Sequence, residues 1–164
     1  MLKKTAMTAV SRKSLVAICF VLIATPVAWA AQPVVFTILT RGNDSGISTF
    51  SQAVVRSPDR WAALWQRHAA GSRIPTVPPA VDFSRNMVIA VFFGKGPVGR
   101  RTAISDIVER DGQLVVSVQM IGPPGPESED LPQITPFLIV QLARSPAPVV
   151  FVRAKIPDLY QPGR

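Results

Sequence analysis

The residues best suited to bind a ligand form a positively charged, glycine-rich stretch at positions 94–101, GKGPVGRR. Backbone amides of a glycine loop can hold a phosphate group, and neighbouring cations strengthen the attraction. This composition predicts a contact site for an anionic ligand or for a partner protein. The candidate contact residues are Lys95, Gly96, Pro97, Gly99, Arg100 and Arg101.

The spacing within this stretch differs from that of known nucleotide loops. No Gly-Lys-Ser/Thr sequence follows the glycines, as a Walker loop requires, and no dinucleotide fingerprint leads into a helix. The same residues also suit an exposed hairpin turn between two strands, which is the simpler interpretation. The sequence leaves both interpretations open.

Catalytic and metal-binding residue types are scarce. A Ser-His-Asp triad would need His68, the single histidine, which falls at the end of the packing stripe of a predicted helix and is expected to be helix-terminal or half-buried. No cysteine follows Cys19, so zinc and copper sites lack their usual ligands. No pair of carboxylates stands out at the ends of neighbouring strands. We therefore expect a protein that is not an enzyme and that uses no cofactor and no metal.

Residues 1–30 have the pattern of a secretory signal peptide. A basic start is followed by ten apolar residues at positions 15–24, and Ala28-Trp29-Ala30 offers a cleavage site. The apolar stretch is much shorter than a membrane span of about 20 residues. Cys19 is preceded by Ile18 and lies inside the apolar core, which disfavours lipid attachment. We expect cleavage after Ala30, no stable membrane anchor, and a periplasmic or secreted bacterial protein formed by residues 31–164 as a single domain.

Removal of the signal peptide changes the charge balance. The full chain has 18 basic and ten acidic residues, and four of the basic residues but none of the acidic ones lie in residues 1–30. The remaining net charge of +4 is mild, and aromatic residues are not interleaved with a basic patch. Nucleic-acid binding is therefore not expected.

The elements that position the basic stretch begin with an apolar run. Residues 87–93 are continuously apolar and end at Gly94, a pattern that predicts a strand buried on both faces in the middle of a sheet. A helix is predicted before it, with Ser57 at the N-cap, Pro58 at the first position and Asp59 in the first turn. Its apolar stripe, at helical spacing, is Trp61, Leu64, Trp65 and His68.

The remaining segments read as strands and turns. Strands are predicted at 33–40 and 49–55, paired as a hairpin, at 102–109 and 113–121, joined by Asp111-Gly112, and at 136–142 and 149–155. A proline-rich connector at 72–80 is expected to cross the sheet, with partner binding as the alternative. The predicted fold is α+β: about seven mainly antiparallel strands, in a sheet or a barrel-like arrangement, with one amphipathic helix packed on it.

Several of these segments resemble the PrcB C-terminal domain family. The resemblance rests on 53–71 (AVVRSPDRWAALWQRHAAG), 81–99 (VDFSRNMVIAVFFGKGPVG), 108–118 (VERDGQLVVSV) and the Thr-Pro-Phe at 135–137, and it covers roughly 53–155. Members of this family are secreted or lipid-anchored, and its namesake associates with a surface protease and stabilises it. The chain departs from the family at Arg100-Arg101, where relatives commonly have Gly-Gly followed by an aromatic residue or threonine.

Two functions remain after these exclusions. The first, which the resemblance implies, is a non-enzymatic accessory protein that binds another envelope or secreted protein, with a protease as the suggested partner. It would use residues 94–101 or a sheet edge, by strand addition. The alternative is a binder of a small anionic ligand or an envelope polymer through residues 94–101.

Overall fold

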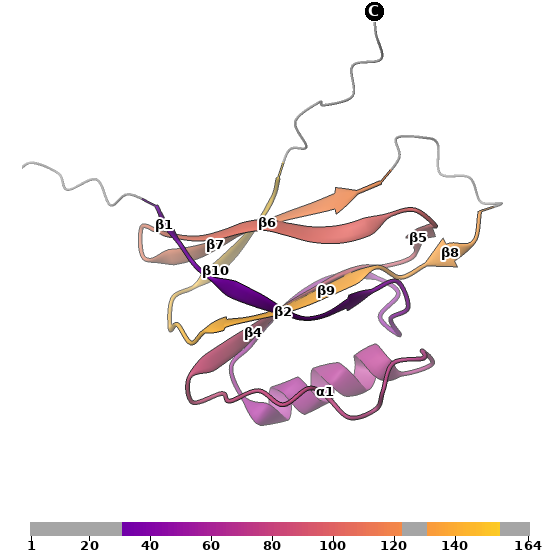
Figure 1. The fold of residues 1–164 in the computed structure, drawn as a ribbon, viewed down its shortest axis with the longest axis horizontal. Helices are drawn as coiled ribbons and strands as arrows, with labels where there is room; N and C mark the ends of the chain where they lie inside the picture. Colours follow the sequence, from indigo (N-terminus) through magenta and orange to yellow (C-terminus); the bar gives the residue numbers. More distant parts are fainter. Residues whose placement is uncertain (1–30, 123–130, 155–164) are drawn as a thin grey trace, which may run out of the picture.

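The computed structural model describes residues 31–122 and 131–154, which form a stack of three layers (Figure 1). Two β-sheets lie face to face, and one helix covers the outer face of the second sheet. The predicted α+β class is confirmed, and the strands of the described residues form stacked sheets that do not close into a barrel. The predicted signal peptide at 1–30 lies outside the described residues.

Strand order explains the layering. The first sheet has the order β1-β6-β7-β10 and consists of β1 (Gln32–Pro33), β6 (Arg101–Arg110), β7 (Gln113–Ile121) and β10 (Val149–Arg153). The second has the order β2-β9-β4-β3 and consists of β2 (Phe36–Gly42), β9 (Phe137–Ala143), β4 (Asn86–Phe93) and β3 (Phe50–Val55). A short ribbon pairs β5 (Gly96–Pro97) with β8 (Gln133–Ile134). Apart from the parallel pair β7–β10, all these pairs are antiparallel.

Strand β4 is buried on both faces, as its uninterrupted apolar sequence predicts. Met87, Ile89 and Val91 face the first sheet, whereas Val88 and Phe92 face the helix, and none of the five is exposed. Successive side chains of a strand point to opposite faces, so one short run contributes to two cores. β4 therefore joins the three layers through hydrophobic packing.

The predicted pairing of the first two strands is wrong. Strands β2 and β3 form opposite edges of the second sheet, separated by β9 and β4. The cause is burial: β4 and β9 are apolar on both faces and occupy the centre, whereas β2 and β3 carry several exposed residues and occupy the edges. Local turn signals could not reveal that a distant strand inserts between them.

The hairpin between β6 and β7 is confirmed. Asp111 and Gly112 form a two-residue loop with φ values of 51° and 72°, and Arg110 pairs with Gln113 on either side. Positive φ at both loop residues matches the right-handed twist of the flanking strands. This loop lies far from residues 94–101 along β6.

Helix α1 (Pro58–Ala69) begins after Ser57 and buries the predicted stripe of four side chains. The indole nitrogens of two of them also serve as donors: Trp61 Nε1 donates to Pro79 O at 3.0 Å, and Trp65 Nε1 donates to Pro75 O at 2.8 Å. These bonds hold the connector 72–80, which we call the strap, against the helix. No helix in the described part of the chain is long and apolar enough to cross a membrane.

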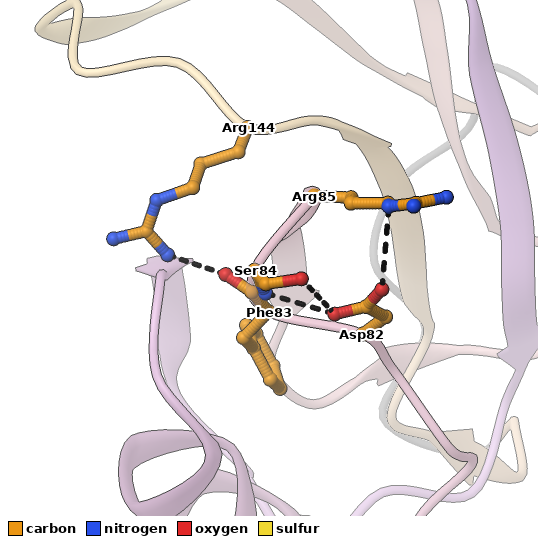
Figure 2. Close-up of polar contacts among 5 residues, drawn as sticks. All are labelled: Asp82, Phe83, Ser84, Arg85 and Arg144. Carbon is orange, nitrogen blue, oxygen red and sulfur yellow. Dashed lines mark hydrogen bonds and ion pairs between the residues drawn. The ribbon is translucent and has the colours of Figure 1, made fainter.

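The turn that leads into β4 is tied down by hydrogen bonds (Figure 2). The Asp82 carboxylate accepts hydrogen bonds from the Ser84 hydroxyl at 2.6 Å and the Ser84 amide at 3.0 Å, which lower the pKa of Asp82. Arg144 donates to the carbonyl oxygens of Phe83 and Arg56, and its own amide donates to Arg85 O at 2.7 Å. We call this part of the molecule the closed end.

Candidate functional site

The opposite end of the stacked sheets holds the candidate site, and we call it the open end. Three segments meet there: 40–48, which includes the end of β2; 94–102, which leads from β4 into the start of β6; and 131–137, which leads into the start of β9. Three hollows lie among these segments, and Asn43 borders all of them. Figure 1 shows the ends of β2 and β9 beside the β5–β8 ribbon on this side.

The stretch 94–101 is a crossing between sheets, so its interpretation as a hairpin turn is wrong. It leaves the second sheet at β4 and enters the first sheet at β6, and β5 pairs with β8 on the way. Two main-chain bonds fix its course, from Lys95 N to Ser48 O at 3.0 Å and from Val98 N to Pro132 O at 2.9 Å. The stretch therefore belongs to the framework of the open end.

This course separates the predicted contact residues. Lys95 borders a hollow of about 240 Å³, and Arg101 borders a different one of about 340 Å³. Gly96 and the buried Pro97 form strand β5 between them. The side chain of Arg100 lies near Gly96 and Gly122, and Gly99 occupies a turn. The six residues therefore do not form one continuous anion-binding loop.

The hollow of about 340 Å³ is cationic, and we call it the cationic pocket. Arg41 from β2 and Arg101 from β6 border it, which brings the edges of the two sheets together. In the described residues no carboxylate forms an ion pair with either guanidinium. Thr102 is 9 % exposed, and its Oγ1 has no hydrogen-bond partner in this part of the chain. The lining residues are Arg41, Gly42, Asn43, Arg101, Thr102 and Phe137.

Sequence reasoning missed three of the four polar residues of this pocket. Arg41 and Asn43 belong to a stretch that reads as a turn, and Thr102 reads as the first residue of a strand. Only Arg101 was a candidate. No local pattern relates position 41 to position 101, because their proximity depends on how the two sheets stack.

A larger hollow of about 500 Å³ lies between β2 and the strap, and we call it the groove. Its walls are largely apolar, with Trp65, Ile74 and Phe137 among them, and Arg41, Asp44 and Arg73 add charge. The pairing of β2 with β9 shifts register between Ile38 and Thr40, and the extra residue, Leu39, also lines the groove. The full set is Leu39, Thr40, Arg41, Gly42, Asn43, Asp44, Trp65, Arg73, Ile74, Pro75, Val77, Pro78, Pro79 and Phe137.

His68 lies in the last turn of α1, as one of its two predicted positions had it, but it is fully buried, so the half-buried alternative is wrong. Its Nδ1 is 2.8 Å from Ser45 Oγ, and its ring centre is 4.3 Å from that of Phe137. Burial lowers the pKa of His68 to about 4, and the charge of Asp44 acts in the opposite direction. Because Nε2 has no hydrogen-bond partner in the described residues, the imidazole lacks the second, orienting bond of a catalytic triad.

The Ser45–His68 contact therefore fastens the turn after β2 to the helix. Two further bonds support this role, from Gly46 N to His68 O at 2.8 Å and from Ile47 N to Ser45 Oγ at 3.1 Å. Thr135 completes the arrangement, because its hydroxyl accepts a bond from Ser45 N and donates one to Ser45 O. These bonds hold residues 43–48 in place at the rim of all three hollows.

A metal site is not formed by the described residues, which contain no group of three His, Cys, Asp or Glu side chains placed to bind an ion. Comparison of the chain with protein-family models, with curated proteins and with solved structures found no match in any of the three. The geometry of the open end is therefore the basis for assigning a function.

Proposed function

We propose that this chain is a non-enzymatic binding module that holds an extended segment of another protein against the free edge of β2. The observation that carries the proposal is the position of the groove, which runs between an edge strand of the second sheet and the strap. In this form of recognition, main-chain hydrogen bonds to the edge give affinity and a neighbouring groove gives selectivity.

Strand β2 provides the edge. It is seven residues long and pairs with β9 on one side, while no described strand pairs with its other side. An unpaired edge presents a row of amide and carbonyl groups to an incoming chain. The exposed side chains of Ile38 and Val35 lie along or just before this strand.

The groove favours a segment that combines apolar and acidic side chains. Its apolar wall would accept every second side chain of an added strand, since these point to one face. Arg41 and Arg73 lie on its rim, and the Asp44 carboxylate already accepts a bond from Arg73 N at 3.0 Å. Two cations beside one engaged carboxylate favour an acidic residue in the partner.

The sequence supplies the setting for this proposal. The signal-peptide pattern of residues 1–30 favours a partner in the envelope or outside the cell. The resemblance to the PrcB C-terminal domain family favours a protease as the partner and an accessory role for this chain. A second candidate, an anionic ligand bound by residues 94–101, is supported in part, because Arg101 borders the cationic pocket while Lys95 borders another hollow.

The test is affinity capture of the tagged protein from its own cell envelope, comparing two matched variants. Val77 is 75 % exposed and lines the groove, whereas Val98 is 47 % exposed and lies outside it in the 94–101 crossing. We expect Val77→Asp to lose a stoichiometric partner that the unmodified protein and Val98→Asp retain. Competition with a synthetic peptide from the captured partner would then locate the bound segment.

Two results would overturn the proposal. One is capture that is lost in Val98→Asp but retained in Val77→Asp, which would move the contact from the groove to residues 94–101. The other is the absence of any stoichiometric partner for folded, clean protein. Circular dichroism of each variant provides the folding control.

A further inference from the structure

We propose that the cationic pocket, which shares Arg41, Gly42, Asn43 and Phe137 with the groove, is a site for a phosphate-type oxyanion, either free or as part of a lipid headgroup. This inference does not depend on the groove or on a protein partner. It goes beyond the predicted loop site, because three of the four polar residues of the pocket (Arg41, Asn43 and Thr102) lie outside residues 94–101. Arg41 belongs to β2 of the second sheet and Thr102 to β6 of the first.

The pocket concentrates positive charge. Arg41 is the last residue but one of β2 and Arg101 begins β6, and both residues border the same pocket of about 340 Å³. The ion pair that the described residues form, between Arg85 and Asp82, lies at the closed end. Two cations that share a pocket without a described counter-ion repel each other, and a bound anion removes this repulsion.

The hydroxyl group of Thr102 lacks a hydrogen-bond partner among the described residues. Thr102 points between the sheets at the start of β6, is 9 % exposed, and lines the pocket. Its Oγ1 is buried and has no hydrogen-bond partner in the described part of the chain. Buried polar groups nearly always have a partner, so a lone hydroxyl beside two cations points to a ligand that accepts its hydrogen bond.

The hydrogen-bond donors of the pocket are of the types that bind phosphate oxygens. A guanidinium presents a planar fork of N–H groups that suits the oxygens of phosphate, and its charge shortens and strengthens the bonds. The Asn43 amide and the Thr102 hydroxyl add neutral donors at the same pocket. Phe137 forms part of the wall and limits screening by water on that side.

The experiment is a titration of the protein with inorganic phosphate, followed by amide chemical shifts in NMR at low ionic strength. We expect saturable shifts at Arg41, Asn43 and Thr102. Arg101→Ala should weaken phosphate binding about tenfold, which is the effect of losing one charge-assisted contact of about 1.4 kcal/mol. Thr102→Val should weaken it several-fold, and Thr102→Ser should restore it.

The matched control is Arg110→Ala, which removes the same charge from the exposed far end of the same strand. It should leave phosphate binding within twofold of that of the unmodified protein. Equal weakening by Arg101→Ala and Arg110→Ala would overturn the proposal, because it would reflect general attraction to a basic protein. Absence of saturable binding of both phosphate and vesicles would also overturn it.

A second arm distinguishes the two sources of the oxyanion. Co-sedimentation with phosphatidylglycerol vesicles, lost in Arg101→Ala and absent with phosphatidylcholine vesicles, identifies a lipid headgroup as the source. Phosphate binding without co-sedimentation identifies a free oxyanion. Val77→Asp, which alters the groove alone, should leave both readouts unchanged, so failure of the groove proposal and failure of this one are separable.

Discussion

Each end of the stacked sheets holds a pair of arginines, Arg56 and Arg144 at the closed end and Arg41 and Arg101 at the open end. Arg56 and Arg144 donate four hydrogen bonds of 2.6 to 2.9 Å to main-chain carbonyl oxygens. Arg41 and Arg101 border a pocket, and no described carboxylate pairs with them. The two pairs share one residue type and differ in what surrounds the guanidinium groups.

The difference separates framework arginines from candidate ligand contacts. A guanidinium whose donors are taken up by carbonyl oxygens fixes the turns around it and has little left to offer a ligand. A guanidinium at a pocket without such acceptors keeps its donors for an anion. Net charge counts both kinds equally and cannot tell them apart.

The largest predicted effect concerns acid, which acts on the open end through His68. Its pKa falls from 6.5 to about 4 on folding, because burial disfavours the charged imidazole. The unfolded chain therefore binds a proton more readily than the folded one. The contribution of neutral, buried His68 to the free energy of unfolding is fully present above pH 6.5 and is lost as the pH falls toward 4. The full loss is roughly 3 kcal/mol. Urea unfolding at pH 7 and pH 4.5 measures it.

The control for the acid effect is His68→Gln, which keeps a polar side chain and cannot titrate in this range. We expect the variant to be less stable at pH 7 but to lose much less stability between pH 7 and 4.5. An unchanged pH dependence in the variant would show that other groups cause it and that His68 is not the acid-sensitive part of the open end.

The second prediction compares two glycines with positive φ, one in a crowded part of the main chain and one in open space. Gly94 has φ +76°, and a Cβ there would lie 2.9 Å from Ser48 O, whereas Gly112 has φ +72° and open space around it. Gly94→Ala combines backbone strain with a main-chain clash, so we expect a loss of about 2 to 3 kcal/mol. Gly112→Ala should lose about 1 kcal/mol. Equal losses in thermal unfolding would mean that the crossing after β4 adjusts without penalty.

The third prediction tests the closed end. Arg144→Ala removes two hydrogen bonds to the carbonyl oxygens of Phe83 and Arg56, so we expect a loss of about 1 to 2 kcal/mol in chemical denaturation. Arg56→Ala removes bonds to Ser145 and Ala147 and should have a similar effect. Phosphate binding should be unaffected by either variant. A loss below 0.5 kcal/mol in both would contradict the framework role.

The smallest expected effect on stability is at the open end. Arg41→Ala should change the free energy of unfolding by less than about 0.5 kcal/mol, the usual range for surface substitutions away from structural contacts. Relief of repulsion with Arg101 makes a slight stabilisation the expected sign at low salt. A loss as large as that of Arg144→Ala would show that Arg41 is part of the framework, and the contrast between the two ends would fail.

Much of the fold was readable because single segments carry strong signals. The apolar run of β4, the stripe of α1 and the Asp111-Gly112 loop each depend on neighbouring residues and local backbone preferences. The separation of β2 from β3 was not readable, because the partner of β2 is β9, more than 80 residues further along the chain. The burial of His68 was underestimated, since Phe137 and Ser45 reach it from distant segments.

The candidate site divides in the same way. The sequence by itself determined the elements, the cationic character of residues 94–101, and the apolar faces that make the layers stack. Only the tertiary structure decided that Lys95 and Arg101, on either side of β5, border different hollows. It also decided that Arg41 and Thr102 border the same pocket as Arg101. The physical reason is that the hydrophobic effect depends on the apolar area buried and has no preferred direction. It specifies which faces of the helix and strands are covered. Strand order and sheet stacking specify which polar side chains meet at the edges of the sheets.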